Sequence, residues 1–357
     1  MIIQKGSWWK ITGILLFAYV LIGGMIIPLR PGITVVKPSG GLAGKRLVLM
    51  IEGYNTHFKE AVQTRAWLKL DSVHAIKTIL FTPLSANTAT AEFYIPKSFP
   101  REDQVHPLHL ILDNEIDGVF VQPNAVFITT SENLDFNPAE WRNHGMGDFS
   151  RYRGIQFPYR NILNETIRNT FFHVALWFAM FLLLIFGVYH SVQYLRTKKF
   201  DHDHWAEAFT STAIVYGVLG IITGAVWAKH TWNTYWTNDV KLNMTAIALL
   251  IYFAYSILRG MQTDQDKRAS LSAIYNIFAF IALIPLVFVI PRMTDSLHPG
   301  NGGNPALGGE DLDYTLRLFF YPSIIALFLI GSWISQLHVR YNRLRDNIYL
   351  KNQEKIS

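Results

Sequence analysis

Large aromatic residues gather in one short stretch of the sequence, and an acidic residue follows them. Trp227, Trp232, Tyr235 and Trp236 lie within ten residues, and Asp239 comes three residues later. An aromatic belt at a membrane interface would account for any one of these rings, because Trp and Tyr are enriched there. On a helix, Trp232 and Trp236 would share one face, and Tyr235 would lie on an adjoining face with the acid. The spacing therefore predicts a flat aromatic platform on which another π-system can stack.

Two histidines flank this stretch and could bind a metal centre. His173 follows two phenylalanines at the start of an apolar run, and His298 lies in a later segment between two such runs. A histidine at a helix end is commonly an interfacial residue whose polar tip reaches water. Neutral imidazole is also a good axial ligand of haem iron, and two of them can occupy both faces of the macrocycle. We therefore expect His173 and His298 to ligate haem iron, with His230 as the competing ligand inside the aromatic stretch.

Six apolar runs must position these residues. Each is long enough to cross, as a helix, a bilayer core of roughly 30 Å. Their approximate bounds are 11–27, 171–195, 206–227, 242–258, 271–290 and 316–335. Basic residues precede the first run and follow the second, fourth and sixth, which places both termini in the cytoplasm. The aromatic stretch and both histidines then share the outer side of the membrane.

The composition excludes several classes of protein. The chain has 357 residues and no cysteine, which excludes a thiol reductant, an iron–sulfur protein and a c-type cytochrome. Its residues are 50% hydrophobic and only 16% charged. Much of the Lys and Arg behind the net charge of +6 stands at the ends of the apolar runs, a pattern typical of membrane anchoring. We therefore expect the lipid bilayer as a partner and no nucleic acid.

The sequence between the first two runs has the character of a soluble domain. Alternating stretches such as 46–51, 118–121 and 125–130 predict β-strands, and turn signals such as Pro123-Asn124 separate them. The predicted fold is an α-helical integral membrane protein: a six-helix transmembrane bundle with an inserted β-rich extracytoplasmic domain, a small sandwich or barrel. The expected divisions are a first transmembrane helix at 1–28, an inserted periplasmic domain at 29–165, a five-helix membrane core at 166–340 with a Trp-rich loop at 227–241, and a cytoplasmic basic tail at 341–357.

The aromatic stretch and its flanking histidines resemble a known family. The pattern Trp227-x4-Trp232-x2-Tyr235-Trp236-x2-Asp239 is similar to the tryptophan-rich signature loop, or WWD domain, of the haem-handling proteins of cytochrome c biogenesis. The six helices, the position of the loop and the histidine on either side of it resemble most closely the CcmC-type members, and the resemblance covers residues 160–340. The loop departs from the family pattern at five positions: Ala228, His230, Asn233, Tyr235 and Asn238. The domain inserted between the first two helices is a second departure.

The resemblance implies a haem carrier and not an enzyme. It implies that His173 and His298 hold haem b at the periplasmic face of the bacterial inner membrane, against the aromatic loop. It also implies haem export, by transfer of the haem to a CcmE-like periplasmic haem chaperone with the help of a CcmAB-like ABC-type complex. Cytochrome c would then receive haem that this chain had held but not altered.

Charged residues near the predicted site have less specific roles. Lys229, Lys241, Arg292 and Arg317 are candidates, by charge alone, to pair with haem propionates. An unpaired buried carboxylate is costly, so we expect Asp239 to be exposed at the edge of the loop or paired with Lys241 or with backbone N–H groups.

Two alternatives stay open. A CcsA-like haem-attachment component shares the aromatic loop but would need further histidines inside the membrane. A small-solute permease would need paired charges in the helix interiors, and the predicted runs are nearly free of charge.

Overall fold

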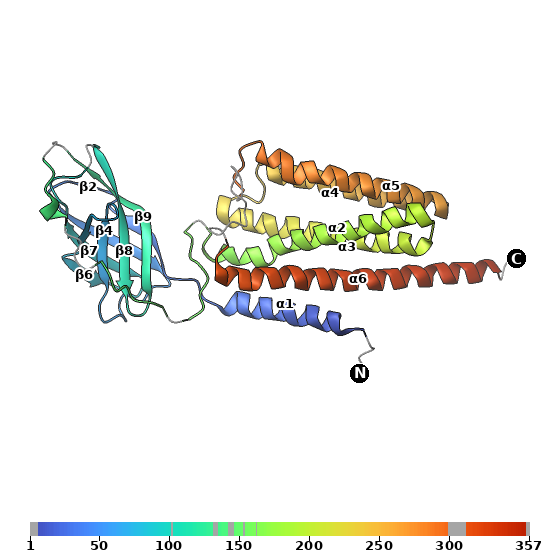
Figure 1. Cartoon of the computed structure of the whole chain (residues 1–357), viewed down its shortest axis with the longest axis horizontal. Helices are drawn as coiled ribbons and strands as arrows, with labels where there is room; N and C mark the ends of the chain where they lie inside the picture. Colours follow the sequence, from blue (N-terminus) through green and yellow to red (C-terminus); the bar gives the residue numbers. More distant parts are fainter. Residues whose placement is uncertain are drawn as a thin grey trace. The chain divides into compact units, whose positions relative to one another are not determined.

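The computed structural model describes residues 6–100, 103–130, 135–141, 146–152, 154–161, 163–298 and 312–354. The chain forms two compact units, one made of Met1–Ile26 with Glu165–Ser357 and the other of Ile27–Asn164. Figure 1 shows helices in the first unit and β-sheets in the second. Each unit has a buried hydrophobic core of its own.

Six helices make up the first unit, and all six are long and apolar enough to cross a membrane. They are α1 (Trp8–Ile26), α2 (His173–Thr197), α3 (Phe200–Trp232), α4 (Val240–Met261), α5 (Gln265–Ile284) and α6 (Tyr314–Glu354). Large apolar side chains such as Leu250 and Ile281 stay exposed along them, as expected for helix surfaces that face lipid tails. The described residues thus contain six candidate helical spans, and the prediction of a multi-pass integral membrane protein is confirmed.

Four short helical segments complete the described helices. They are η1 (Pro138–Glu140) in the second unit, and η2 (Asn164–Phe171), η3 (Pro285–Val289) and η4 (Ile290–Arg292) in the first. Segment η2 leads directly into α2 and buries Ile167 and Phe171, so the helical course starts before His173. Its geometry is that of a 3₁₀ helix. The Gly- and Pro-rich stretch after His298 lies outside the described residues.

Two helices extend beyond the predicted runs. Helix α6 continues to Glu354, so the predicted basic tail from residue 341 is largely helical. Helix α3 begins at Phe200, six residues before the predicted run. It therefore contains Asp203 and Glu207, both of which pair with Arg259 of α4. The predicted runs themselves stay nearly free of charge, because, of these three residues, only Glu207 lies within one. The paired charges stand mainly where the helices extend beyond the runs, and there opposite charges neutralise each other.

Close packing of α2 on α3 depends on glycines along α3. A Cβ atom at Gly220 would lie 2.7 Å from the indole of Trp177 in α2, and one at Gly217 would lie 3.1 Å from Met180 Sδ in α2. Without a lipid-driven hydrophobic effect between helices, association depends on such small residues, which let the helices approach closely.

Hydrogen bonds between helices add to this packing. Asn276 of α5 is fully buried and donates to Ser191 Oγ of α2 and to Thr210 Oγ1 of α3, both at 3.0 Å. Tyr216 of α3 donates its hydroxyl to the carbonyl of Leu327 in α6 at 2.8 Å. Such bonds contribute roughly 0.6 kcal/mol each in membranes, so they help to fix helix positions more than they add to stability.

The second unit contains two β-sheets. One has the order β1-β3-β7-β6 and the other β2-β9-β8-β4-β5, and neighbouring strands within these sheets are antiparallel except β2 with β9. The strands are β1 (Gly32–Lys37), β2 (Gly40–Leu42), β3 (Arg46–Tyr54), β4 (Arg65–Lys69), β5 (Ala75–Lys77), β6 (Leu80–Pro83), β7 (Thr88–Tyr94), β8 (Val105–Asn114) and β9 (Gly118–Thr129). Inward residues of both sheets form one buried cluster. The β-rich character of this segment is confirmed.

One predicted turn in this unit was wrong. Pro123-Asn124 lies inside β9, where the sequence had predicted a break between two strands. The register between β8 and β9 shifts between Leu108 and Leu110, and the Asn124 N–H donates to His109 Nδ1 at 3.0 Å. Asn124 adopts a φ of 49°, so an irregularity in the ladder accommodates the turn-forming pair without ending the strand.

Candidate functional site

His173 is the first residue of α2, and its ring lies against α3. Its Nδ1 atom is 2.9 Å from the carbonyl oxygen of Gly220 and 3.1 Å from Thr223 Oγ1. The Gly220 carbonyl oxygen can only accept, so the imidazole donates its Nδ1–H to it. A proton held on Nδ1 leaves the lone pair on Nε2, which is the tautomer that a metal ligand needs.

A glycine makes room for this ring. A Cβ atom at Gly224 would lie 2.7 Å from Cε1 of His173 and 3.4 Å from its Nε2. Gly220 and Gly224 are four residues apart and thus lie on the same face of α3. Sequence reasoning missed both glycines and Thr223, although the Gly-x-x-x-Gly spacing in an apolar helix is a recognisable signal for close helix contact.

The second histidine lies beside two of the predicted tryptophans. The ring centroids of His298 and Trp227 are 5.8 Å apart, and those of His298 and Trp232 are 6.4 Å apart. Trp227 and Trp232 pack edge to face with centroids 4.9 Å apart. His298 is also close enough to His173 for the two imidazoles to interact electrostatically. The structure therefore brings both histidines and both tryptophans to one end of the helix bundle.

Asp239 holds the segment that carries His298. Its carboxylate caps α4 by accepting from the Lys241 N–H at 2.9 Å, and it accepts from Ser296 Oγ at 3.0 Å and the Leu297 N–H at 2.8 Å. The His298 N–H in turn donates to Ser296 Oγ at 3.1 Å. Asp239 is 6% exposed, so of the two expectations for this residue the exposed one was wrong and pairing with backbone N–H groups was right. Sequence reasoning missed Ser296.

The environment of Asp239 stabilises its ionised form. Burial alone would raise the pKa of this carboxyl, but hydrogen bonds from Ser296, Leu297 and Lys241 outweigh burial and hold the pKa below its ordinary value of 3.8. The carboxylate is therefore charged at neutral pH. It accepts hydrogen bonds both from the start of α4 and from the segment that carries His298.

The predicted aromatic platform was wrong in its geometry. Helix α3 ends at Trp232, because Asn233 adopts a left-handed conformation with a φ of 59°. The predicted loop at 227–241 therefore consists of the last turns of α3, a short connection and the start of α4. Tyr235 and Trp236 lie in the connection, 61% and 41% exposed, and do not continue the helical face of Trp232.

Neighbouring polar groups hold these two exposed rings. Lys229 Nζ lies 5.7 Å from the centre of the Tyr235 ring and donates to the carbonyl of Asn233 at 3.0 Å. Trp236 donates its indole N–H to Asn243 Oδ1 at 3.3 Å. The connection is therefore ordered by its own contacts, with two aromatic faces open to the surroundings.

The other predicted residues lie around this end of the bundle. His230 is exposed on the last turn of α3. Arg292 donates to the carbonyl of Phe288, and Arg317 donates to that of Leu312. Across the residues that the structure describes, no cluster of three or more His, Cys, Asp or Glu side chains could hold a bare metal ion. A pair of imidazoles beside aromatic rings suits the axial positions of a haem better than a site for an isolated ion.

The chain is similar in sequence to known proteins over the part that contains these residues. Residues 162–298 match the family model described as "Cytochrome C assembly protein". "Heme exporter protein C" of Bradyrhizobium diazoefficiens is 27% identical over 182 residues, which cover 49% of this chain and 64% of the relative. "Cytochrome c biogenesis protein CcsA" of Spinacia oleracea is 29% identical over 106 residues, which cover 29% of this chain and 32% of that relative. The same-named protein of Drimys granadensis is 33% identical over 88 residues, covering 25% of this chain and 26% of the relative.

These matches confirm the resemblance predicted from the aromatic stretch and the two histidines. The chain is similar to the CcmC and CcsA type of cytochrome c biogenesis protein. The matched part spans from about a quarter to about two thirds of these relatives. The family match begins at residue 162, so it leaves nearly all of the unit Ile27–Asn164 uncovered.

Acid should release the contacts of Asp239. A carboxyl with a lowered folded-state pKa stabilises the fold above its ordinary pKa, and this contribution is lost as the pH falls through the lower folded value. We expect Asp239→Asn to lower the free energy of unfolding at pH 7 by about 1–3 kcal/mol. The further loss of stability that the wild type shows below about pH 4 should be smaller in this variant. Thermal unfolding in detergent, followed by circular dichroism from pH 3 to 7, measures both effects.

Asp264 provides a matched control. It caps α5 by accepting from the Lys267 N–H at 2.7 Å, as Asp239 caps α4. Asp264→Asn should therefore cost only the contribution of a cap. An Asp239→Asn variant that follows the wild-type profile at every pH would contradict the assigned role of this carboxylate.

Proposed function

We propose that this protein binds haem between His173 and His298 at the periplasmic face of a bacterial cytoplasmic membrane and delivers it for cytochrome c maturation. The observation that carries the proposal is the 2.9 Å contact between His173 Nδ1 and the Gly220 carbonyl oxygen, which calls for a proton on Nδ1 and leaves Nε2 for iron. The family model matches residues 162–298, which include both histidines, and a relative bears the name "Heme exporter protein C", which favours the same cargo.

Each residue of the site has a physical task in this proposal. His173 and His298 would hold the iron of haem b through their imidazole nitrogens, as the proposed axial ligands. Trp227 and Trp232 offer aromatic surface beside His298, and flat π-systems stack favourably on such surface. Asp239 does not touch iron; it fixes the segment that presents His298.

The exposed part of the loop offers a surface on which a partner that receives the haem can dock. Tyr235 and Trp236 are exposed, and aromatic side chains of this kind are enriched where protein partners dock. A CcmE-like haem chaperone would contact these rings and receive the haem, with the help of a CcmAB-like ABC-type complex. No bond of the haem is broken, so the chain acts as a carrier and not as an enzyme.

A second candidate function is haem attachment by a CcsA-like component. The matches to proteins named CcsA favour it, although they cover smaller parts of those proteins than the match to Heme exporter protein C does. Both candidates use the same haem site. They differ in whether haem leaves on a chaperone or is joined to apocytochrome in place, so the product found in cells that lack the chaperone distinguishes them.

Removal of either histidine should disturb the haem spectrum. Protein purified from haem-replete cells should show a Soret band, and His173→Ala or His298→Ala should weaken or shift it because one axial ligand is lost. Added imidazole should restore part of the band by filling the vacated position. If both variants keep the wild-type spectrum, the ligand assignment is wrong, and His230→Ala becomes the next variant to measure.

Crowding of the His173 ring should have the same effect without removal of the ligand. In Gly224→Val the new side chain would occupy the space of the imidazole, so we expect haem per purified protein to fall severalfold. The matched control is Gly260→Val, since a Cβ atom at Gly260 meets nothing within 4 Å. Equal haem content in the two variants would contradict the role of Gly224 in making room for the His173 ring.

Labelling of single cysteines tests the proposed sidedness. The native chain contains no cysteine, so each introduced thiol is a unique probe. A cysteine at Asn238 should react with an impermeant thiol reagent added outside the cell. Cysteines at Lys199 and Thr263 should react only after the membrane is opened. Inverted labelling would place the haem site in the cytoplasm and end the proposal of periplasmic delivery.

A further inference from the structure

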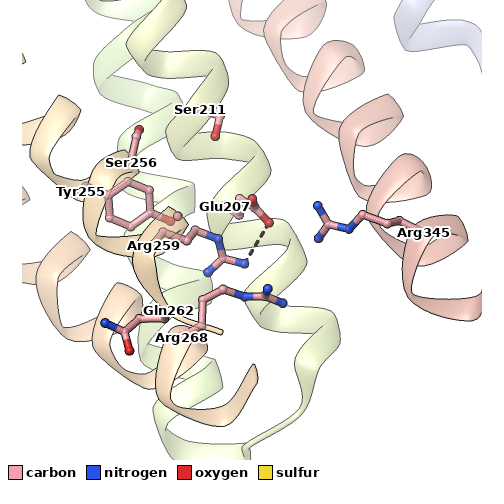
Figure 2. Close-up of a pocket in the computed structure, with 9 residues that line it drawn as sticks. Glu207, Ser211, Tyr255, Ser256, Arg259, Gln262, Arg268 and Arg345 are labelled. Carbon is pink, nitrogen blue, oxygen red and sulfur yellow. Dashed lines mark hydrogen bonds and ion pairs between the residues drawn. The ribbon is translucent and has the colours of Figure 1, made fainter. Parts of the chain in front are cut away.

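A polar pocket lies at the end of the helix bundle remote from the haem site. Figure 2 shows it between α3, α4, α5 and α6, with arginine side chains drawn around it. Its volume is about 220 Å³. Asp239 and Arg259 stand at opposite ends of α4, and twenty residues of α-helix at a rise of about 1.5 Å each place them roughly 30 Å apart. The haem site and this pocket therefore lie near opposite surfaces of the membrane.

Arg259 supplies the rigid wall of the pocket. Its guanidinium binds both carboxylate oxygens of Asp203, at 2.8 and 2.7 Å, and also Glu207 at 2.8 Å. Asn342 of α6 donates to the same Glu207 oxygen at 2.8 Å. Arg259 is 6% exposed, and a buried charge of this kind is tolerated because the two acids surround it. These bonds fix the positions of α3, α4 and α6 around the pocket.

Two further arginines reach the pocket with less complete pairing. Arg268 of α5 has a buried Nε that meets no hydrogen-bond acceptor within the part of the chain that the structure describes. Arg345 of α6 lies with its Nε 3.6 Å from Asp346, a carboxylate that also binds His204 at 2.9 Å. In Figure 2 the guanidinium groups of Arg259, Arg268 and Arg345 approach one another from three helices. The lining thus has three cations, one carboxylate and a donor that needs an acceptor.

We propose that this pocket binds a phosphate group, from an anionic lipid headgroup or a soluble phosphate compound. Guanidinium forks match phosphate oxygens, and a phosphate offers enough oxygens to engage Arg268 and Arg345 at once. The hydroxyl of Ser211, which also lines the pocket, can donate to a remaining oxygen. The depth suits a lipid source, because phosphates lie just outside a hydrocarbon core of roughly 30 Å and basic pockets between transmembrane helices bind such headgroups.

The first measurement uses the full-length wild-type protein. In detergent, inorganic phosphate should raise the unfolding temperature above that in chloride at equal ionic strength. Native mass spectrometry should show phosphatidylglycerol retained in preference to phosphatidylcholine. A response to lipid alone assigns the headgroup as the source, and a response to inorganic phosphate alone assigns a soluble compound. The proposal is overturned if phosphate stabilises the protein no more than chloride does and phosphatidylglycerol is retained no better than phosphatidylcholine.

Variants locate the effect in the pocket. Arg268→Gln and Arg345→Gln should each weaken binding by about tenfold, because each removes a charged donor. Arg345→Lys should recover part of this loss, since it restores the charge without the fork. Arg268 and Arg345 lie outside the Asp203–Glu207–Arg259 cluster, so these variants keep its ion pairs.

Matched controls remove a charge from the same helices outside the pocket. Lys267 of α5 and Arg340 of α6 are exposed, and neither lines the pocket. Lys267→Gln and Arg340→Gln should bind phosphate and phosphatidylglycerol as the wild type does. If these controls lose as much affinity as the pocket variants, binding reflects the general charge of this membrane surface, and the pocket is not a specific site. The Soret band should be unchanged in all of them, which separates this result from any failure of the haem proposal.

Discussion

The close approach of α2 to α3 is the constraint on which the candidate site depends. Lipid tails give two apolar helices no reason to associate beyond packing, so the contact needs small residues that let the helix surfaces meet. Gly220 and Gly224 provide that closeness at the end where α2 begins. The same approach brings the Gly220 carbonyl to 2.9 Å from His173 Nδ1, which orients the imidazole and fixes its tautomer. Helix packing and ligand chemistry are therefore set by one contact.

A second constraint acts on the other histidine, which lies in a segment between two spans and not on a packed helix. Such a segment has to be tied to a rigid element before it can hold a ligand in place. Asp239 supplies the tie, because one carboxylate accepts from the start of α4 and from the segment that carries His298. The charge of Asp239 thus acts by holding the His298 segment in position. The ion pairs around Arg259 serve the opposite end of the bundle in the same way, by joining α3 to α4.

The unit Ile27–Asn164 packs independently of these helix contacts. Its two sheets bury residues such as Leu49, Phe93 and Leu110 in a common core, which makes it self-sufficient in packing. The family match leaves it uncovered, while the helices on both sides of it in the sequence close into one membrane unit. An insertion is tolerated at such a place because it joins two helix ends at the bundle surface and leaves the helix contacts undisturbed.

Length and residue type, which are local properties, let the sequence by itself determine the six spans, the β-rich insert and the pairing of two histidines with an aromatic stretch. The tertiary structure decided which of these groups meet. Asn233 ends α3, so Trp227 and Trp232 pack beside His298 while Tyr235 and Trp236 turn outward. Helical spacing could not foresee this, because a left-handed residue interrupts the period from which the spacing argument starts. Only the folded chain likewise brings together other groups from segments far apart in the sequence. These are Asp239 with its partners, Gly224 with the His173 ring, and the arginines around the polar pocket.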